Sequence, residues 1–209
     1  MSLIQTILDQ KIVAIIRLEN YDKAIEIATA LVAGGISTLE FTLTGKGAME
    51  AITSVRGALG DKVGVGVGSV LTPDDASDAI DAGAQFVVTP ALRHSVIDLC
   101  INRETPIVCG GLTPTELLEA YEAGSELVKL FPAQLGGPRY LKDVLAPMPF
   151  LKLVPTGGVS PDNARDYLAA GAVALGIGGN LISKKAVAEG DFAQITDAAQ
   201  ACIAAIHAH

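Results

Sequence analysis

Tryptophan is absent from the 209-residue chain, and aromatic side chains of all kinds account for only 4% of it. Charged residues make up 18%, below the roughly 25% that is typical of globular chains. Half of the residues are nevertheless hydrophobic, which excludes a disordered or low-complexity protein. Because this apolar material is mostly Ala, Val, Ile and Leu, the composition is typical of an α/β protein whose strands are buried on both faces.

Cysteine is also scarce. The three cysteines, Cys100, Cys109 and Cys202, are widely spaced and odd in number. There is no Cys-x-x-Cys pair and no Cys/His cluster, so the sequence predicts neither a zinc site nor the disulfide scaffold of a small secreted protein. We expect a chain that holds no metal.

Basic residues are outnumbered, with 15 Lys and Arg against 23 Asp and Glu, for a net charge of −8. Such a surface repels nucleic acid and anionic membranes, although a local pocket can still bind a small anion. No uninterrupted apolar run reaches the roughly 18 residues of a membrane helix, and residues 1–6 lack the basic flank of a signal peptide. We therefore expect a soluble, cytoplasmic protein without nucleic-acid or membrane partners.

Short runs of apolar and β-branched residues predict eight strands, at residues 12–16, 38–43, 63–67, 85–88, 106–108, 127–131, 151–154 and 173–177. Helical spacing of apolar residues predicts a helix over 21–32, with Asn20 as its N-cap. Thr72-Pro73, Thr113-Pro114 and Ser160-Pro161 are typical helix starts. Ala-Gly pairs at 33–34, 82–83, 123–124 and 170–171 predict helix ends.

The repetition of a strand followed by a helix implies right-handed crossovers and a parallel sheet. Eight such units without a linker predict a single (β/α)₈ TIM barrel, an α/β fold that forms one domain over residues 1–209. A doubly wound open sheet is the alternative.

Two charged residues stand inside apolar strands, Glu40 in the second and Lys129 in the sixth. These strands face each other across an eight-stranded barrel, so both side chains can reach one central cavity. A buried Glu–Lys ion pair with a structural role is the alternative, although such pairs stabilise less well than apolar packing.

The residues next to Lys129 in the sequence favour a catalytic role for its amine. Val128, Leu130 and Phe131 form an apolar setting that disfavours the ammonium form. A neutral lysine attacks carbonyl groups and forms a Schiff base, which acts as an electron sink. Glu40 can then move the protons that this reaction requires, and no metal or cofactor is needed.

The last two strands end in glycines, at Thr156-Gly157-Gly158 and at Gly178-Gly179-Asn180. Loops after strands seven and eight form the common phosphate site of these barrels. Glycine lets backbone N–H groups approach an oxyanion, and Thr156 and Asn180 can add side-chain donors. Tight barrel turns that use glycine for steric reasons alone are the alternative.

Several segments together resemble the KDPG/KHG aldolase family, in which KDPG is 2-keto-3-deoxy-6-phosphogluconate and KHG is 4-hydroxy-2-oxoglutarate. The resemblance runs through nearly the whole chain, and its segments are residues 35–43, Gly66-Val67-Gly68-Ser69-Val70-Leu71, residues 86–90, Lys129-Leu130-Phe131-Pro132-Ala133 and Pro155-Thr156-Gly157-Gly158. It implies a cofactor-free class I aldolase of carbohydrate metabolism. The implied partner is a small, phosphorylated keto acid, and the implied assembly is a homotrimer.

The resemblance also implies roles for individual residues. Lys129 corresponds to the Schiff-base lysine and Glu40 to the acid/base glutamate. The phosphate end of the substrate is assigned to Thr156, Gly157 and Gly158, with Gly178 and Gly179 beside them. Pro90 and Phe131 match residues that line the pyruvate pocket, and Arg17 stands where relatives carry a basic residue near the substrate.

The chain departs from the family pattern at three positions. The arginine that usually binds the substrate carboxylate is Thr44, the usual threonine of the strand-three turn is Ser69, and the usual serine after the strand-eight glycines is Asn180. We expect the carboxylate to be held by neutral donors such as Ser69 and Thr44, or by Arg17. Lys46 is either a substitute cation or a solvated loop residue.

Two other functions fit the same residues. A phosphosugar isomerase or decarboxylase shares the barrel and its phosphate site but needs no imine-forming lysine. A barrel that only binds a metabolite would leave Lys129 and Glu40 paired.

Overall fold

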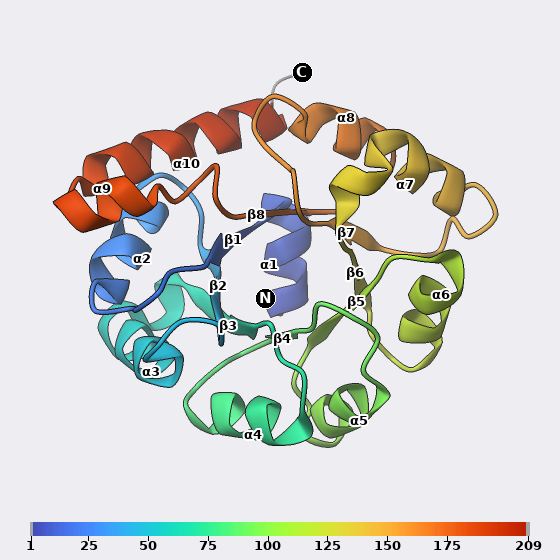
Figure 1. The fold of residues 1–209 in the computed structure, drawn as a ribbon, viewed down its shortest axis with the longest axis horizontal. Coiled ribbons are helices and arrows are strands. Elements are labelled where there is room, and N and C mark those ends of the chain that lie inside the picture. The colour runs from blue at the N-terminus through green and yellow to red at the C-terminus, as the bar shows by residue number, and fades with distance from the viewer. Residues whose placement is uncertain (1, 208–209) are drawn as a thin grey trace.

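Eight parallel strands form a barrel in the computed structural model, which describes residues 2–207 (Figure 1). They are β1 (Ile12–Ile16), β2 (Thr38–Thr42), β3 (Gly64–Gly68), β4 (Val87–Val88), β5 (Ile107–Gly111), β6 (Leu127–Leu130), β7 (Leu153–Pro155) and β8 (Leu175–Ile177). Neighbouring strands pair in chain order, β1 also pairs with β8, and a single parallel bridge from Thr156 to Gly176 joins the β7 and β8 sides. The predicted barrel is confirmed, and the doubly wound open sheet is excluded.

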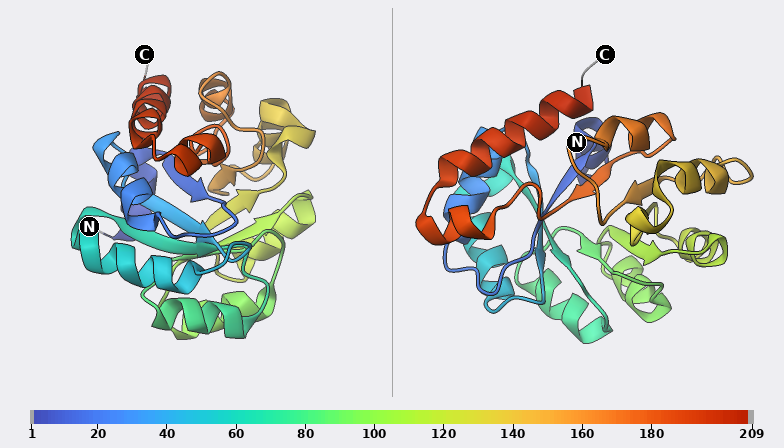
Figure 2. Two further views of the ribbon diagram at one scale, coloured as in Figure 1. Left: turned by 60° about the vertical axis from the view of Figure 1, so that its left-hand side comes forward. Right: turned by 45° about the horizontal axis from the view of Figure 1, so that its top comes forward.

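Helices surround the barrel on its outside, as Figures 1 and 2 show. They are α2 (Ala24–Ala33), α3 (Ala48–Leu59), α4 (Pro73–Asp81), α5 (His94–Asn102), α6 (Pro114–Glu122), α7 (Gly137–Leu145), α8 (Ala164–Ala169), α9 (Lys184–Glu189) and α10 (Phe192–His207). Among residues 2–207, no helix has both the length and the apolar character that crossing a membrane requires. Met1, Ala208 and His209, which the sequence analysis includes in the domain, lie outside the described residues.

Side chains alternate between two cores because successive residues of a strand point to opposite faces. Leu39 and Phe41 of β2 point outward and pack with the surrounding helices. Val13, Phe86 and Leu127 point inward and fill the barrel. Glu40 and Lys129 stand at the inward-facing positions of their strands, so their side chains also point into the barrel.

An additional helix, α1 (Leu3–Gln10), closes the amino-terminal end of the barrel and lies in the centre of the ring in Figure 1. The Ser2 hydroxyl caps it by accepting a hydrogen bond from the Gln5 N–H at 3.2 Å. Ile4 and Ile7 pack onto the inward-facing core. This helix, which was not predicted from the sequence, forms the floor below the charged residues.

The structure confirms some of the predicted helix boundaries and corrects others. Thr72 and Thr113 are side-chain N-caps as predicted. Asn20 is not a cap, because α2 begins only at Ala24. Ser160-Pro161 forms a turn instead of a helix start, since the Asn163 carboxamide binds the Ser160 N–H and α8 begins at Ala164.

The predicted helix ends hold at all four Ala-Gly pairs, and only the position of the left-handed residue differs at one of them. Gly83, Gly124 and Gly171 have the positive φ that ends a helix, whereas at the end of α2 this residue is Gly35 rather than Gly34. β7 and β8 each begin two residues later than predicted, at Leu153 and Leu175.

Candidate active site

A cavity of about 330 Å³ lies at the carboxyl ends of the strands. All but one of the predicted site residues line it, namely Arg17, Glu40, Ser69, Pro90, Lys129, Phe131, Thr156, Gly157, Gly158, Gly178, Gly179 and Asn180. Ile15, Thr42, Val159 and Gly176 also line it and were not predicted. Thr44 and Lys46 are exposed and are not among the lining residues.

Glu40 and Lys129 project into this cavity from strands on opposite sides of the ring. Their side chains are nearly buried, with 3% and 6% of each residue exposed. The floor beneath them is apolar and includes Ile7, Phe86 and Leu127. The sequence-based expectation that both residues reach one cavity is met.

No ion pair within 4.0 Å joins Glu40 to Lys129, so the structural alternative of a direct pair does not describe these residues. In the part of the chain that the structure describes, no fully buried polar side-chain atom lacks a hydrogen-bond partner. None of the hydrogen bonds among the described residues involves the Glu40 carboxyl or the Lys129 amine. Both groups must therefore be exposed to the open space of the cavity. They are available to a bound molecule.

The Glu40 carboxyl and the Lys129 amine have different surroundings. Burial raises the pKa of the Glu40 carboxyl, and the positive charge of Lys129 opposes this shift only in part. The Phe131 ring centre lies 5.1 Å from the Lys129 amine, within range of a cation–π contact. An amine that can attack a carbonyl therefore faces a carboxyl group that can take up or release a proton.

Gly68, the last residue of β3, leaves the space that the Glu40 side chain occupies. A Cβ atom added to Gly68 would overlap the Glu40 Oε1 and Cδ atoms and lie 2.7 Å from its Cγ. Only glycine leaves room for the carboxyl in this position. The sequence suggests no such role, since the close approach becomes visible only once the side chain is placed.

The hydroxyl groups of Thr42, Thr44 and Ser69 lie on the β2 and β3 side of the site, and that of Tyr21 contacts Thr42. The Thr42 Oγ1 atom is 2.8 Å from the Thr44 Oγ1 and 3.1 Å from the Tyr21 hydroxyl. Ser69 has a φ of +62°, a left-handed conformation that is uncommon outside glycine and is often found at functional sites. Thr42 and Ser69 line the cavity, whereas Thr44 supports Thr42 from outside it.

The glycine turns after β7 and β8 form the opposite side of the cavity. Gly157 and Gly158 have φ values of +91° and +75°, which favour glycine. Asn180 donates a hydrogen bond from Nδ2 to the Val159 carbonyl at 3.1 Å and so connects the two turns. Within residues 2–207, the N–H groups of Gly178 and Gly179 appear in no backbone hydrogen bond of a turn or loop. Backbone donors of this kind suit an oxyanion.

No three His, Cys, Asp or Glu side chains among the described residues are grouped in a way that could hold a metal ion. The chemical groups that the cavity does offer are one amine, one guanidinium, one carboxyl, one carboxamide, hydroxyls and backbone N–H donors. Such a set fits a negatively charged carbonyl compound.

Comparison with known proteins identifies relatives whose sequences align with almost the entire chain. The family model described as KDPG and KHG aldolase matches residues 3–198. A 2-dehydro-3-deoxy-phosphogluconate aldolase of Treponema pallidum is 36% identical over 192 residues, which cover 91% of this chain and 90% of that protein. A KHG/KDPG aldolase of Escherichia coli K12 is 35% identical over 194 residues, covering 92% and 90%.

A solved structure has the same fold. It is a KDPG aldolase from Legionella pneumophila with pyruvate captured at low pH as a covalent carbinolamine intermediate. Its sequence is 29% identical, the match covers 92% of this chain and 93% of that one, and the TM-score is 0.86.

Proposed function

Since the chain belongs to the KDPG and KHG aldolase family, we propose that it is a class I aldolase that cleaves 2-keto-3-deoxy-6-phospho sugar acids. The products are pyruvate and glyceraldehyde 3-phosphate. With 4-hydroxy-2-oxoglutarate the products are pyruvate and glyoxylate. The observation that carries the proposal is the nearly buried Lys129 amine, which faces Glu40 across a cavity and has no ion-pair partner within residues 2–207.

In the proposed reaction, the neutral amine of Lys129 adds to the C2 carbonyl of the substrate and forms a carbinolamine. Loss of water, assisted by proton transfer from Glu40, gives a protonated imine. The Glu40 carboxylate then accepts the proton of the C4 hydroxyl as the C3–C4 bond breaks, and the bond electrons move to the imine nitrogen. The aldehyde leaves, C3 of the enamine is protonated, and water releases pyruvate from Lys129.

The rest of the cavity supports an orientation for the substrate. The hydroxyls of Thr42 and Ser69 are available to the carboxylate beside the reacting carbonyl. The glycine turns and the Thr156 hydroxyl suit the phosphate at the other end. Pro90 and Phe131 supply apolar contact for the pyruvate half.

The family resemblance supports further proposals. We propose that residues 1–209 act as one domain, that the substrate is phosphorylated, that the assembly is a homotrimer and that the protein works in the cytoplasm.

The test of this function is pyruvate release, measured by coupling to lactate dehydrogenase. The substrates are 2-keto-3-deoxy-6-phosphogluconate, 2-keto-3-deoxy-6-phosphogalactonate and 4-hydroxy-2-oxoglutarate. We expect turnover of at least one of them. If none yields pyruvate, the aldolase proposal is wrong. A phosphosugar isomerase or decarboxylase would then remain among the functions that fit the barrel.

Replacing Gly68 with alanine should slow turnover by roughly 10²-fold or more, because the added methyl group displaces the Glu40 carboxyl from its position. The backbone of Gly68 has no positive φ, so strain there is not expected to add to the effect. kcat and the unfolding midpoint would be measured together. Gly57→Ala in α3 is the control, since a Cβ atom there meets nothing within 4 Å. A fully active, folded Gly68→Ala enzyme would contradict this role.

Replacing Thr44 with arginine should lower the KM for the phosphogluconate substrate about tenfold with little change in kcat. A hydrogen bond from a charged donor contributes roughly 1.5–3 kcal/mol, and a guanidinium binds a carboxylate more strongly than a hydroxyl does. Thr44 lies beside the cavity-lining Thr42, so a longer side chain can extend to the mouth. Thr44→Gln, which adds length without charge, is the control. Equal KM values for the two variants would show that no cation is accommodated here.

A further inference from the structure

A second cavity, of about 570 Å³, adjoins the active site beyond the turn that follows β8. It shares Ile15, Arg17, Gly178 and Gly179 with the active-site cavity. Ile182 and Lys184 complete its lining. The two cavities therefore lie on either side of the same residues, at the end of the site that carries the glycine turns.

The charge of this second cavity is opposite to that of the chain. Of the described residues, Arg17 and Lys184 are the only ionisable ones that line it, in a protein whose net charge is −8. Among residues 2–207, neither side chain forms an ion pair within 4.0 Å. A locally positive cavity with uncommitted cations attracts a negatively charged group.

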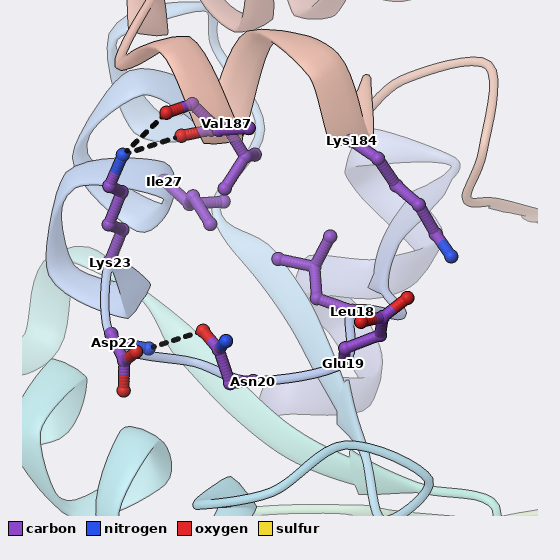
Figure 3. Close-up of a pocket in the computed structure, with 9 residues that line it drawn as sticks. Leu18, Glu19, Asn20, Asp22, Lys23, Ile27, Lys184 and Val187 are labelled. Atoms are coloured by element: carbon purple, nitrogen blue, oxygen red, sulfur yellow. Dashed lines mark hydrogen bonds between the residues drawn. The ribbon is translucent and has the colours of Figure 1, made fainter.

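The neighbouring groove between α9 and the loop after β1 provides a contrast (Figure 3). There Lys23 donates hydrogen bonds to the Val187 carbonyl at 2.7 Å and to the Ala188 carbonyl at 3.2 Å, so its amine has a structural role at the end of α9. Lys184 extends away from Lys23 at the other end of the helix and makes no such bond. Lys184 lines this groove as well as the second cavity, whereas Glu19 lines the groove alone, and among residues 2–207 the two form no ion pair within 4.0 Å.

We propose that Lys184, together with Arg17, binds the distal anionic group of the substrate and makes the enzyme favour a phosphate over a single carboxylate. The proposal rests on the aldolase function above and adds a specificity-determining residue to it. A phosphate ester carries close to two negative charges at neutral pH and presents three acceptor oxygens, whereas a carboxylate carries one charge. Backbone N–H donors approach such a group from the glycine turns, and the two cations approach it from the second cavity.

The test compares steady-state kinetics of Lys184→Met with two substrates. For the phosphogluconate substrate we expect KM to rise about five- to twentyfold with kcat within about twofold, in the range for a charged hydrogen bond near solvent. For 4-hydroxy-2-oxoglutarate, whose distal group is a carboxylate, the rise should be less than about threefold. Lys184→Arg should restore most of the loss. Lys185→Met is the matched control, because Lys185 lies on the same helix and lines neither cavity. Its Nζ atom lies 3.9 Å from the Glu189 Oε1 atom.

Borohydride trapping with pyruvate separates this proposal from the function itself, because pyruvate has no distal group. Trapping should be equal in the wild type, Lys184→Met and Lys185→Met. Normal trapping with an unchanged KM for the phosphorylated substrate would overturn the role of Lys184, and so would an equal rise for both substrates or for both lysine variants. Absence of trapping in the wild type would instead count against the aldolase function.

Discussion

Replacing Lys129 with alanine is expected to lower kcat by several orders of magnitude with every substrate that the wild type cleaves. In the proposed reaction the imine is the electron sink for C–C cleavage, and among residues 2–207 Lys129 is the only lysine that lines the active-site cavity. Pyruvate release in the coupled assay is the measurement. A variant that kept a tenth of the wild-type activity would show that another group carries the reaction.

Lys129→Met is the control for packing, because it keeps the length and apolar contacts of the side chain without the amine. Both variants should fold, since Lys129 has no ion-pair partner to lose within the described residues. Both remove the charge that partly offsets the burial of Glu40, so the pKa of that carboxyl should rise further. Equal, severe losses of activity in the two variants would assign the effect to the amine.

Replacing Glu40 with glutamine should slow turnover by roughly 10²- to 10⁴-fold, the usual contribution of a positioned acid or base. The amide is nearly the same size as the carboxyl but cannot exchange the proton. Some imine should still be trapped with pyruvate, because Lys129 remains in place. An equally active Glu40→Gln enzyme would refute the acid/base role.

The same substitution should stabilise the fold at neutral pH. Burial raises the pKa of Glu40 in the folded protein, so the folded state binds its proton more tightly than the unfolded state does. Ionised Glu40 therefore costs stability at neutral pH, and this cost falls as the pH drops through the raised pKa. Urea unfolding should show Glu40→Gln more stable than the wild type at neutral pH, with the difference shrinking in acid. A constant difference at all pH values would contradict this.

The shared cavity of Glu40 and Lys129 could be predicted from the sequence because a charged residue inside an apolar strand is conspicuous, and because strand parity fixes the face to which it points. Thr42 carried a similar signal, two residues after Glu40 and so on the same face of β2, but it was not recognised. Thr44 was predicted as a site residue because it stands where the family resemblance places a carboxylate-binding arginine, just after the second strand. That strand ends at Thr42, and the chain then turns away.

Other features depend on tertiary contacts that no local pattern reveals. Helix α1 has apolar residues at helical spacing, including Ile4 and Ile7, but that it lies under the barrel follows only from the closed ring. The space that Gly68 leaves depends on where the Glu40 side chain lies. Lys184 lines the second cavity because α9 follows the turn after β8, and that arrangement cannot be read from spacing along the chain.

The most direct test of the account is to treat the wild-type protein with pyruvate and borohydride, digest it and locate the covalent adduct by mass spectrometry. We predict one modified peptide, with the reduced pyruvate on the side chain of Lys129, and no such adduct in Lys129→Ala. An adduct on a different lysine, or none in a folded wild-type protein, would contradict the central claim.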